Sequence, residues 1–377
     1  MKRTKLFRHF FESEKAGGLI LVFATIISLC IANSSWQAEY IGFFQQHLGS
    51  HTVVEWINDA LMTIFFLMIG LELEREIYDG ELSNFKSAAL PVFGAFGGML
   101  IPAGLFLLFN YATPTQSGAG IPMATDIAFA IGILSLLGNR VPTSLKVFLT
   151  ALAVIDDLGA IIVIAVFYTK TIAFINLLIA LGIWTVLLIL NRMKVSNLIP
   201  YLIGGILMWY FMLHSGIHAT ITGVLLAFAI PFGNGDENST SYILQRFLHK
   251  PVAFLILPLF ALANTCIPFG SDAGNILGHN NSLGIIIGLV IGKPLGIWLF
   301  SFIAAGLGLC ALPNDLKWKH IIGAGFLGGI GFTMSIFITL LAFDNDATIV
   351  DSKIAILLAS LVAGSIGFIT LKLSLKK

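Results

Sequence analysis

The sequence predicts an all-α protein that crosses a membrane many times. Of its 377 residues, 57% are apolar and only 11% are charged. The apolar residues form continuous runs of about 17–25 residues, which is the length that a helix needs to cross a bilayer. A transmembrane barrel would instead show short strands of alternating hydrophobicity. Because backbone groups in lipid must be satisfied internally, these runs are expected to be helices. One integral membrane domain over residues 1–377 is predicted.

The apolar runs predict twelve spans, and an even number places both termini on one side of the membrane. All but three of the 21 lysines and arginines then fall on the side of the termini. The exceptions are Lys170 and Lys353 on the opposite side and Lys293 within a span. Since basic connections stay in the cytoplasm, both termini are predicted to be cytoplasmic. The spans are expected to begin near residues 17, 57, 88, 121, 145, 172, 199, 215, 251, 283, 320 and 351.

The connections between these spans are too short to hold a folded domain, so the function is expected to lie inside the bundle. The connection over residues 34–56 has alternating polar and bulky side chains. That pattern fits either an extracytoplasmic hairpin that pairs with a second copy of the chain or an irregular loop. The expected partners are therefore the lipid bilayer and a second copy of the chain, and no nucleic acid.

Two apolar segments contain the residues that interrupt helices. The segment 117–134 has glycines and Pro122 before Thr125 and Asp126, and the segment 321–337 has five glycines before Thr333. Interrupted helices are tolerated at membrane depth only where they line a cavity or pack within protein. Such a pair in the two halves of a chain is a signal of a transporter binding site. The alternative is that the glycines serve close helix packing.

Five charged residues fall inside the predicted spans: Asp59, Asp126, Asp156, Asp157 and Lys293. A charged side chain at the bilayer centre costs about 2.5–3.5 kcal/mol on insertion scales, so each is a candidate functional residue. The aspartate near the outer end of its span is equally well explained as a residue of the helix end. The lysine is too deep to reach the interface and needs a carboxylate, free carbonyls or deprotonation, and a purely structural salt bridge is its alternative role.

The adjacent pair Asp156 and Asp157 is the most informative feature. Neighbouring residues on a helix point about 100° apart, so one carboxylate can face a hydrated cavity while the other meets a neighbouring helix. A carboxylate in such a place can hold a proton or a small hard cation, which prefers oxygen ligands. Asp157, Asp126, the Thr125 hydroxyl and carbonyl groups of the interrupted helix would supply these oxygens. Protons and cations are therefore expected to compete for one site.

At these residues the chain resembles the NhaA family of bacterial Na⁺/H⁺ antiporters. The resemblance extends from the second span to the eleventh, and inverted-topology repeats with broken helices are already known for that family. The matching stretches are WINDALMTIFFLMIGLELERE, PMATDIAFAIGILSLLG, LTALAVIDDLGAI, SGIHATITG, ILPLFALANT, GKPLGIWLF and GIGFTMSIFI.

The resemblance implies an electrogenic, pH-regulated antiporter of the inner membrane that expels Na⁺ or Li⁺ in exchange for protons, without a cofactor. It implies that Na⁺ binds at Asp157 and Asp156, with Asp157 as the principal ligand and proton carrier. Lys293 would balance the charge of Asp156. Asp126 and Thr125 would lie where two broken helices cross at the midplane. A homodimer would form partly through the hairpin after the first span.

The pH-responsive region is where the chain departs from the family pattern. Glu72 and Glu76 match the family's acids, whereas Glu74 stands where a basic residue is common. The segment SYILQRFLHKP lacks the acid expected before the ninth span. We therefore expect the activating pH to be shifted or blunted.

Other classes of protein fit the sequence less well. An intramembrane aspartyl protease needs its two aspartates on different helices. His214 and His218 are spaced to share a metal ion, yet no third ligand lies nearby in sequence. The closest alternative is a proton-coupled transporter of a small organic solute. Such a protein would need polar or aromatic side chains to hold the solute, and the spans carry few.

Overall fold

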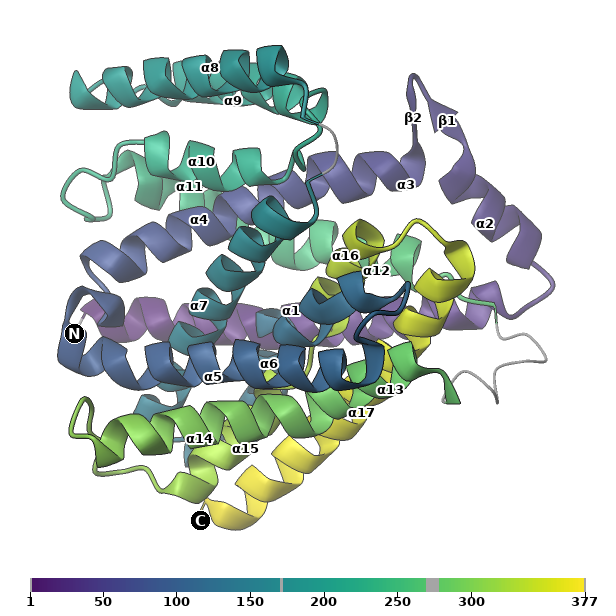
Figure 1. Cartoon of the computed structure of the whole chain (residues 1–377). Coiled ribbons are helices and arrows are strands. Elements are labelled where there is room, and N and C mark those ends of the chain that lie inside the picture. The colour runs from purple at the N-terminus through teal and green to yellow at the C-terminus, as the bar shows by residue number, and fades with distance from the viewer. Residues whose placement is uncertain (1, 170–171, 269–277, 376–377) are drawn as a thin grey trace.

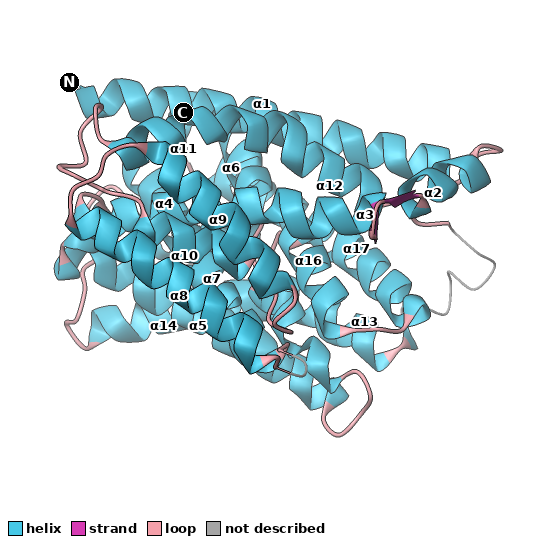
Figure 2. Cartoon of the chain, turned by 90° about the horizontal axis from the view of Figure 1, so that it is seen from above, coloured by secondary structure: helices cyan, strands magenta, loops and turns pink. Residues whose placement is uncertain are grey.

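A computed structural model describes residues 2–169, 172–268 and 278–375 as a bundle of helices (Figures 1 and 2). Both ends of the chain lie toward one end of the bundle, and the β-hairpin lies at the other (Figure 1). Lys170, one of the three basic residues outside the predicted cytoplasmic connections, lies outside the described residues.

The first half contains α1 (Lys2–Ala32), α2 (Gln37–Gln45), β1 (His47–Leu48), β2 (His51–Thr52), α3 (Val53–Trp56), η1 (Ile57–Leu61), α4 (Met62–Tyr78), η2 (Glu81–Ser83), α5 (Phe85–Asn110), η3 (Gln116–Met123), α6 (Ile127–Leu136), η4 (Gly138–Arg140) and α7 (Thr143–Phe167).

The second half is also helical. The helices α8 and α9 lie side by side along one edge of the bundle, in teal at the top of Figure 1. The elements are α8 (Phe174–Arg192), α9 (Leu198–Leu213), α10 (Ile221–Ala229), α11 (Thr240–Pro251), η5 (Val252–Ile256), α12 (Leu257–Asn264), α13 (Asn280–Ile287), η7 (Gly288–Gly292), α14 (Lys293–Gly306), α15 (Trp318–Gly328), α16 (Phe332–Ala342) and α17 (Asp346–Ser374).

Within the described residues, eight helices are long and apolar enough to cross a membrane, or up to ten if each of two bent pairs counts as one span. The sequence predicts twelve, and the difference lies in α9 and α10. The first has 16 residues and the second has nine. At 1.5 Å per residue they are about 24 and 14 Å long, against a hydrocarbon core of about 30 Å. The span expected from residue 215 is therefore a short helix that begins only at Ile221.

Prolines shift other helix boundaries from their predicted places. The span expected to begin at residue 251 begins at Thr240, because the helix continues through Pro251 into the π-helical turn η5. The turns η5 and η7 each end two residues before a proline, Pro258 and Pro294. A proline lacks the N–H group and crowds the carbonyl four residues earlier. A wider π turn at that point lets the helix continue.

Pairs of glycines bring the backbones of particular helices into contact. A Cβ atom on Gly97 of α5 would lie 2.2 Å from the Gly296 carbonyl oxygen of α14. A Cβ atom on Gly223 of α10 would lie 2.2 Å from the Thr63 carbonyl oxygen of α4. Small residues permit this close approach. It increases the van der Waals contact between helices, which matters in lipid because the hydrophobic effect does not drive helices together there. The α5–α14 and α4–α10 pairs are therefore each packed backbone to backbone.

The connection over residues 34–56 folds into α2 followed by the β1–β2 hairpin. His47 pairs with Thr52 in antiparallel register. The Tyr40 hydroxyl donates to the Leu262 carbonyl oxygen at 3.0 Å, which ties α2 to α12. The segment is therefore ordered rather than an irregular loop, and whether it pairs with a second copy stays a prediction.

The outer faces of the bundle carry large apolar side chains. On α8, Phe174, Ile175 and Leu178 are 70%, 76% and 67% exposed. Lipid tails solvate such faces, whereas a soluble protein rarely exposes so large an apolar surface. The chain is therefore a multi-pass membrane protein.

The Gly97 contact generates a prediction about stability. Gly97→Val forces a side chain against a backbone carbonyl and should lower the free energy of unfolding by about 1–3 kcal/mol, the usual cost of overpacking. Gly104→Val is the matched control, because it lies on the same helix and none of the described neighbours comes within 4 Å of its added Cβ. Thermal unfolding in detergent measures both, and equal melting temperatures would contradict the close packing of α5 on α14.

Candidate functional site

The paired aspartates lie near the middle of α7 and are buried. Asp156 is 1% exposed and Asp157 is 0% exposed. The helix is apolar along most of its length, and its buried face continues through both acids. Two carboxylates at this depth are costly unless the surrounding protein or a bound ion compensates their charge.

Lys293 compensates the charge of Asp156. The Lys293 side chain is fully buried, and its Nζ lies 2.7 Å from Asp156 Oδ2. The ammonium also donates to the backbone carbonyl oxygen of Met123, just before the first interrupted segment enters α6. The ion pair joins α7 to α14, and a backbone carbonyl provides a second partner for the lysine. Such extra hydrogen bonds are what makes a buried ion pair tolerable.

The Thr125 hydroxyl links Asp156 to the second interrupted segment. Its Oγ1 lies 2.8 Å from Asp156 Oδ2 and 2.8 Å from the carbonyl oxygen of Gly328, the last residue of α15. A hydroxyl has one hydrogen and can donate to only one of these oxygens at a time. The orientation of this hydroxyl therefore depends on how strongly Asp156 attracts a donor.

Asp126 joins the first turns of two helices. Its Oδ1 accepts from the Phe129 N–H at 2.9 Å, as the N-cap of α6. Its Oδ2 accepts from the Thr333 N–H at 3.1 Å and from the Thr333 hydroxyl, at the start of α16. The Asp126 N–H donates to the Ile330 carbonyl oxygen at 2.7 Å. One carboxylate thus satisfies free N–H groups and offsets the positive dipole ends of both helices.

Three carboxylate oxygens at the centre of this site have no hydrogen-bond partner among the described residues. They are Asp156 Oδ1 and both side-chain oxygens of Asp157. The charges of Asp156, Asp126 and Glu72 act repulsively on Asp157, and Lys293 acts attractively. Buried polar atoms are normally satisfied, so an unsatisfied group of three needs an explanation. A proton or a hard cation would satisfy them.

The remaining predicted residues lie on α4 and the turn before it. Glu72 and Glu74 are buried toward one end of α4, and Glu74 Oε2 has no hydrogen-bond partner among the described residues. Glu76 lies one turn further on and is partly exposed. Asp59 lies in the π-helical turn η1, about 20 Å along the helix axis from Glu72. The structure thus groups Thr125, Asp126, Asp156, Asp157 and Lys293. The charge of Glu72 on α4 also acts on Asp157, whereas Asp59 lies toward the other end of that helix.

The sequence predicted that carbonyl groups of the interrupted helices take part in the site, without indicating which ones. In the structure they are the carbonyl oxygens of Met123, Gly328 and Ile330. Thr333 was noted only as the residue after a glycine run; it lies in the first turn of α16, where its N–H and its hydroxyl both donate to Asp126. His214 and His218 instead bond the backbone carbonyl oxygens of Tyr210 and Tyr168, at 2.8 and 3.0 Å.

Comparisons with known proteins decide the family. Residues 8–371 match the model of the protein family described as Na⁺/H⁺ antiporter 1. The chain belongs to this family. It is 71% identical over 372 residues to Na⁺/H⁺ antiporter NhaA 1 of Flavobacterium johnsoniae, covering 99% of this chain and 98% of that protein. It is 64% identical over 377 residues to Na⁺/H⁺ antiporter NhaA of Cytophaga hutchinsonii, covering 100% of this chain and 97% of that protein.

A solved structure shares the fold of this antiporter family member. The sodium proton antiporter MjNhaP1 from Methanocaldococcus jannaschii matches with a TM-score of 0.55 and 16% identity, over 100% of this chain and 99% of that chain. At this identity the match shows the fold alone. Proteins of the family are named antiporters, so they are transporters and not enzymes.

The Asp156–Lys293 pair generates a prediction about stability. Lys293→Ala leaves a carboxylate uncompensated at depth and should cost about 3–5 kcal/mol of stability, the usual price of breaking a buried pair. Lys319→Ala, at an exposed position on α15, is the matched control. The double variant Asp156→Asn with Lys293→Gln should recover much of the lost melting temperature. Absence of recovery in this double-mutant cycle would show that the lysine has a different main partner.

Proposed function

We propose that this chain expels Na⁺ and Li⁺ across the bacterial inner membrane in exchange for protons, electrogenically, through the site around Asp157. The observation that carries the proposal is a group of three buried carboxylate oxygens on Asp156 and Asp157 that have no hydrogen-bond partner within the part of the chain that the structure describes. Hard cations such as Na⁺ prefer oxygen ligands. The family to which the chain belongs supports Na⁺ and H⁺ as the exchanged ions.

Charge balance explains why exchange would be obligatory. Asp156 is already compensated by Lys293, whose Nζ lies 2.7 Å away, so Asp157 carries the uncompensated charge. An ionised, unoccupied Asp157 would be a bare charge in a buried place, which is strongly unfavourable. The site is therefore stable with a proton or with Na⁺ and unstable when empty. A carrier that must be occupied to close can move one ion out only by bringing another in.

Asp156 and Lys293 would supply the electrogenic step. If Na⁺ draws Asp156 Oδ1 into its ligand sphere, the contact with Lys293 weakens and the lysine can give up a proton. Each Na⁺ would then displace two protons, one from Asp157 and one from Lys293. Two positive charges would move inward for each one that moves outward. The Thr125 hydroxyl, within reach of Asp156 and Gly328, would turn between these two oxygens as the charge on Asp156 changes.

Glu72 and Glu76 are the proposed pH-responsive groups. Glu72 is buried, and its charge acts on Asp157. Ionisation of Glu72 at alkaline pH would make the potential at the site more negative, and a more negative potential favours Na⁺ over an empty site. Glu76 shares the same end of α4. Ion exchange would therefore be activated at alkaline pH. Glu74, on the same helix, would shift the pH at which this activation occurs.

The same proposal fixes how the chain lies in the membrane. Twelve segments would cross it in two inverted repeats, with α9 and α10 completing the two spans that are short of full length. The interrupted segments before α6 and between α15 and α16 would cross at the midplane. Both termini would be cytoplasmic, and two copies would pair through the 34–56 connection. Asp59 would lie on the extracytoplasmic side.

The first functional prediction concerns Asp157. Asp157→Asn removes the charge that must hold Na⁺, so Na⁺ binding and Na⁺-driven proton release should fall to the level of empty liposomes while the protein still inserts. Asp236→Asn, on an exposed loop, is the control for an aspartate change without effect. Purified protein in proteoliposomes gives both readouts. Normal exchange by Asp157→Asn would remove Asp157 from the site.

The second functional prediction concerns pH. Na⁺ binding requires a deprotonated site, so by linkage protons must weaken Na⁺ binding, and the apparent Na⁺ affinity should fall as pH falls. Saturating Na⁺ should then move the activity profile to lower pH. If Glu72 and Glu76 alone set the profile, activity at low pH would stay absent at any Na⁺ concentration. Exchange measured against Na⁺ concentration at several pH values distinguishes these outcomes, and a pH-independent affinity would rule out competition.

A further inference from the structure

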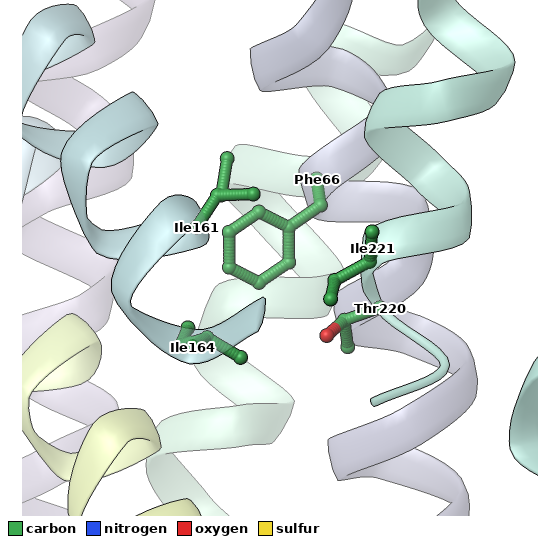
Figure 3. A pocket seen from close by; sticks show the side chains of 5 residues that line it. All are labelled: Phe66, Ile161, Ile164, Thr220 and Ile221. Atoms are coloured by element: carbon green, nitrogen blue, oxygen red, sulfur yellow. The ribbon is translucent and has the colours of Figure 1, made fainter. Parts of the chain in front are cut away.

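Tyr168 lies directly after the last residue of α7, Phe167, and is buried. Its N–H donates to the Ile164 carbonyl oxygen at 3.2 Å. On this last part of α7, the side chains of Ile161 and Ile164 lie against the Phe66 ring of α4 (Figure 3). This packing and the backbone hydrogen bond together fix the position of Tyr168.

The Tyr168 hydroxyl bonds two backbone groups of η3. It donates to the Ser117 carbonyl oxygen at 2.7 Å and accepts from the Gly120 N–H at 3.3 Å. These two groups are three residues apart, which is one turn of a 3₁₀ helix. A Cβ atom on Gly120 would lie 2.6 Å from the hydroxyl oxygen, so only a glycine lets the hydroxyl come this close. Tyr168 therefore fixes one turn of the first interrupted segment to the end of α7.

The other end of η3 contacts the ion site. Met123 is the last residue of η3, and its carbonyl oxygen accepts from Lys293 Nζ. Lys293 Nζ also lies 2.7 Å from Asp156 Oδ2 on α7. The contacts that leave α7 at Tyr168 thus return to α7 at Asp156, about 18 Å away along the helix axis. The position of the Met123 carbonyl oxygen therefore depends on both ends of η3.

A second side chain holds η3 from a different helix. The Ser335 hydroxyl of α16 donates to the Ile121 carbonyl oxygen at 2.7 Å. Asp126 already joins α16 to α6, so this bond ties η3 to the crossing of the interrupted helices. The bonds made by Tyr168 instead tie η3 to the helix that carries the aspartate pair. Tyr168 thus sets where η3 lies relative to α7.

We propose that Tyr168 is a positioning residue for ion exchange, which holds the Met123 carbonyl oxygen against the Lys293 ammonium. This inference rests on the proposed function, in which Lys293 gives up a proton when Na⁺ binds. A hydrogen bond to the charged form of a group favours that form, so the carbonyl oxygen keeps Lys293 protonated until Na⁺ draws Asp156 away. A tyrosine hydroxyl keeps its own proton throughout the neutral range of pH. The contact itself therefore does not titrate.

The pH at which Lys293 loses its proton also depends on the groups around it. Asp156 lies 2.7 Å away, and the charges of Asp157 and Lys293 interact. The oxygens of Asp126 accept from the first turns of α6 and α16. From α5, the uncharged Gly98 lies against the lysine side chain. Removing the phenol hydroxyl changes none of these groups, so a shifted pH profile would report on the carbonyl contact.

The first measurement is the pH profile of Na⁺/H⁺ exchange in proteoliposomes. Tyr168→Phe removes the hydroxyl but keeps the ring and the backbone carbonyl oxygen that bonds His218 Nε2 at 3.0 Å. Lys293 should then lose its proton more easily. The profile should move to lower pH by about 0.5–1 unit, roughly half of what one hydrogen bond to a charged group contributes.

Two further variants make this measurement decisive. Gly120→Ala places a Cβ where the Tyr168 hydroxyl lies, so it should move the profile in the same direction, and it serves if Tyr168→Phe fails to fold. Tyr201→Phe is the matched control. Tyr201 is also buried, and its hydroxyl donates to the Val195 carbonyl oxygen at 3.0 Å, away from the ion site. Its loss should leave the pH profile unchanged.

A stability measurement without Na⁺ tests the link to Lys293 directly. The double variant Asp156→Asn with Lys293→Met is a neutral background in which the Met123 carbonyl oxygen loses its ammonium donor. Contacts that hold the same segment depend on each other, whereas distant independent contacts add. Tyr168→Phe should therefore lower the melting temperature by about half as much, or less, in this background as in the unchanged chain. Tyr201→Phe should lower it equally in both.

Either of two results would overturn the proposal. One is an equal loss of melting temperature from Tyr168→Phe in the two backgrounds. The other is a pH profile that matches that of Tyr201→Phe in both Tyr168→Phe and Gly120→Ala. The stability measurement requires no exchange, so it tests the role of Tyr168 even if Asp157→Asn were to show that the ion site lies elsewhere.

Discussion

The constraint on which the rest of the structure depends is the high cost of an uncompensated charge at membrane depth. Asp156 and Lys293 satisfy this constraint as a pair, with their charged atoms 2.7 Å apart. The pair links α7 to α14, and α14 is packed on α5 through Gly97 and Gly296. One ion pair therefore fixes the position of the aspartate-bearing helix relative to a rigid neighbour. Asp157, one residue away, lies outside this pair, and neither of its side-chain oxygens has a hydrogen-bond partner among the described residues.

Asp126 meets the same constraint at the ends of helices, where it compensates free N–H groups instead of a charged side chain. Interrupting two helices leaves free N–H groups and positive dipole ends where no water can solvate them. Asp126 accepts from the first turns of α6 and α16 and so compensates both. The fold can therefore interrupt two helices next to a buried ion pair without leaving their amides unsatisfied. The interruption in turn frees the carbonyl oxygens of Met123 and Gly328 to take part in the site.

The sequence contained the outline of the fold and the charged residues of the site, and its limits have physical causes. Apolar runs and the adjacent Asp156 and Asp157 stand out because lipid penalises polar groups so strongly. The span expected from residue 215 was placed too early, because the polar, glycine-containing stretch over residues 214–220 is irregular and the helix begins only at Ile221. The start of the ninth predicted span was misplaced because the helix that begins at Thr240 continues through Pro251, a residue that usually ends a helix. Carbonyl groups of an interrupted helix were expected near Lys293, but the choice of Met123 depends on the course of the backbone, which side-chain patterns do not encode.

The Thr125 hydroxyl has a consequence of a different kind. It has a single hydrogen and two acceptors at equal distance, Asp156 Oδ2 and the Gly328 carbonyl oxygen. The hydrogen points to whichever oxygen is more negative, so the orientation of the hydroxyl depends on whether Asp156 is charged. Rotation about one bond of Thr125 therefore makes or breaks the hydrogen bond to the end of α15 when the charge on α7 changes, with no displacement of the backbone. This change of hydrogen-bond partner occurs on the timescale of side-chain rotation, which is much shorter than that of any helix movement that follows it.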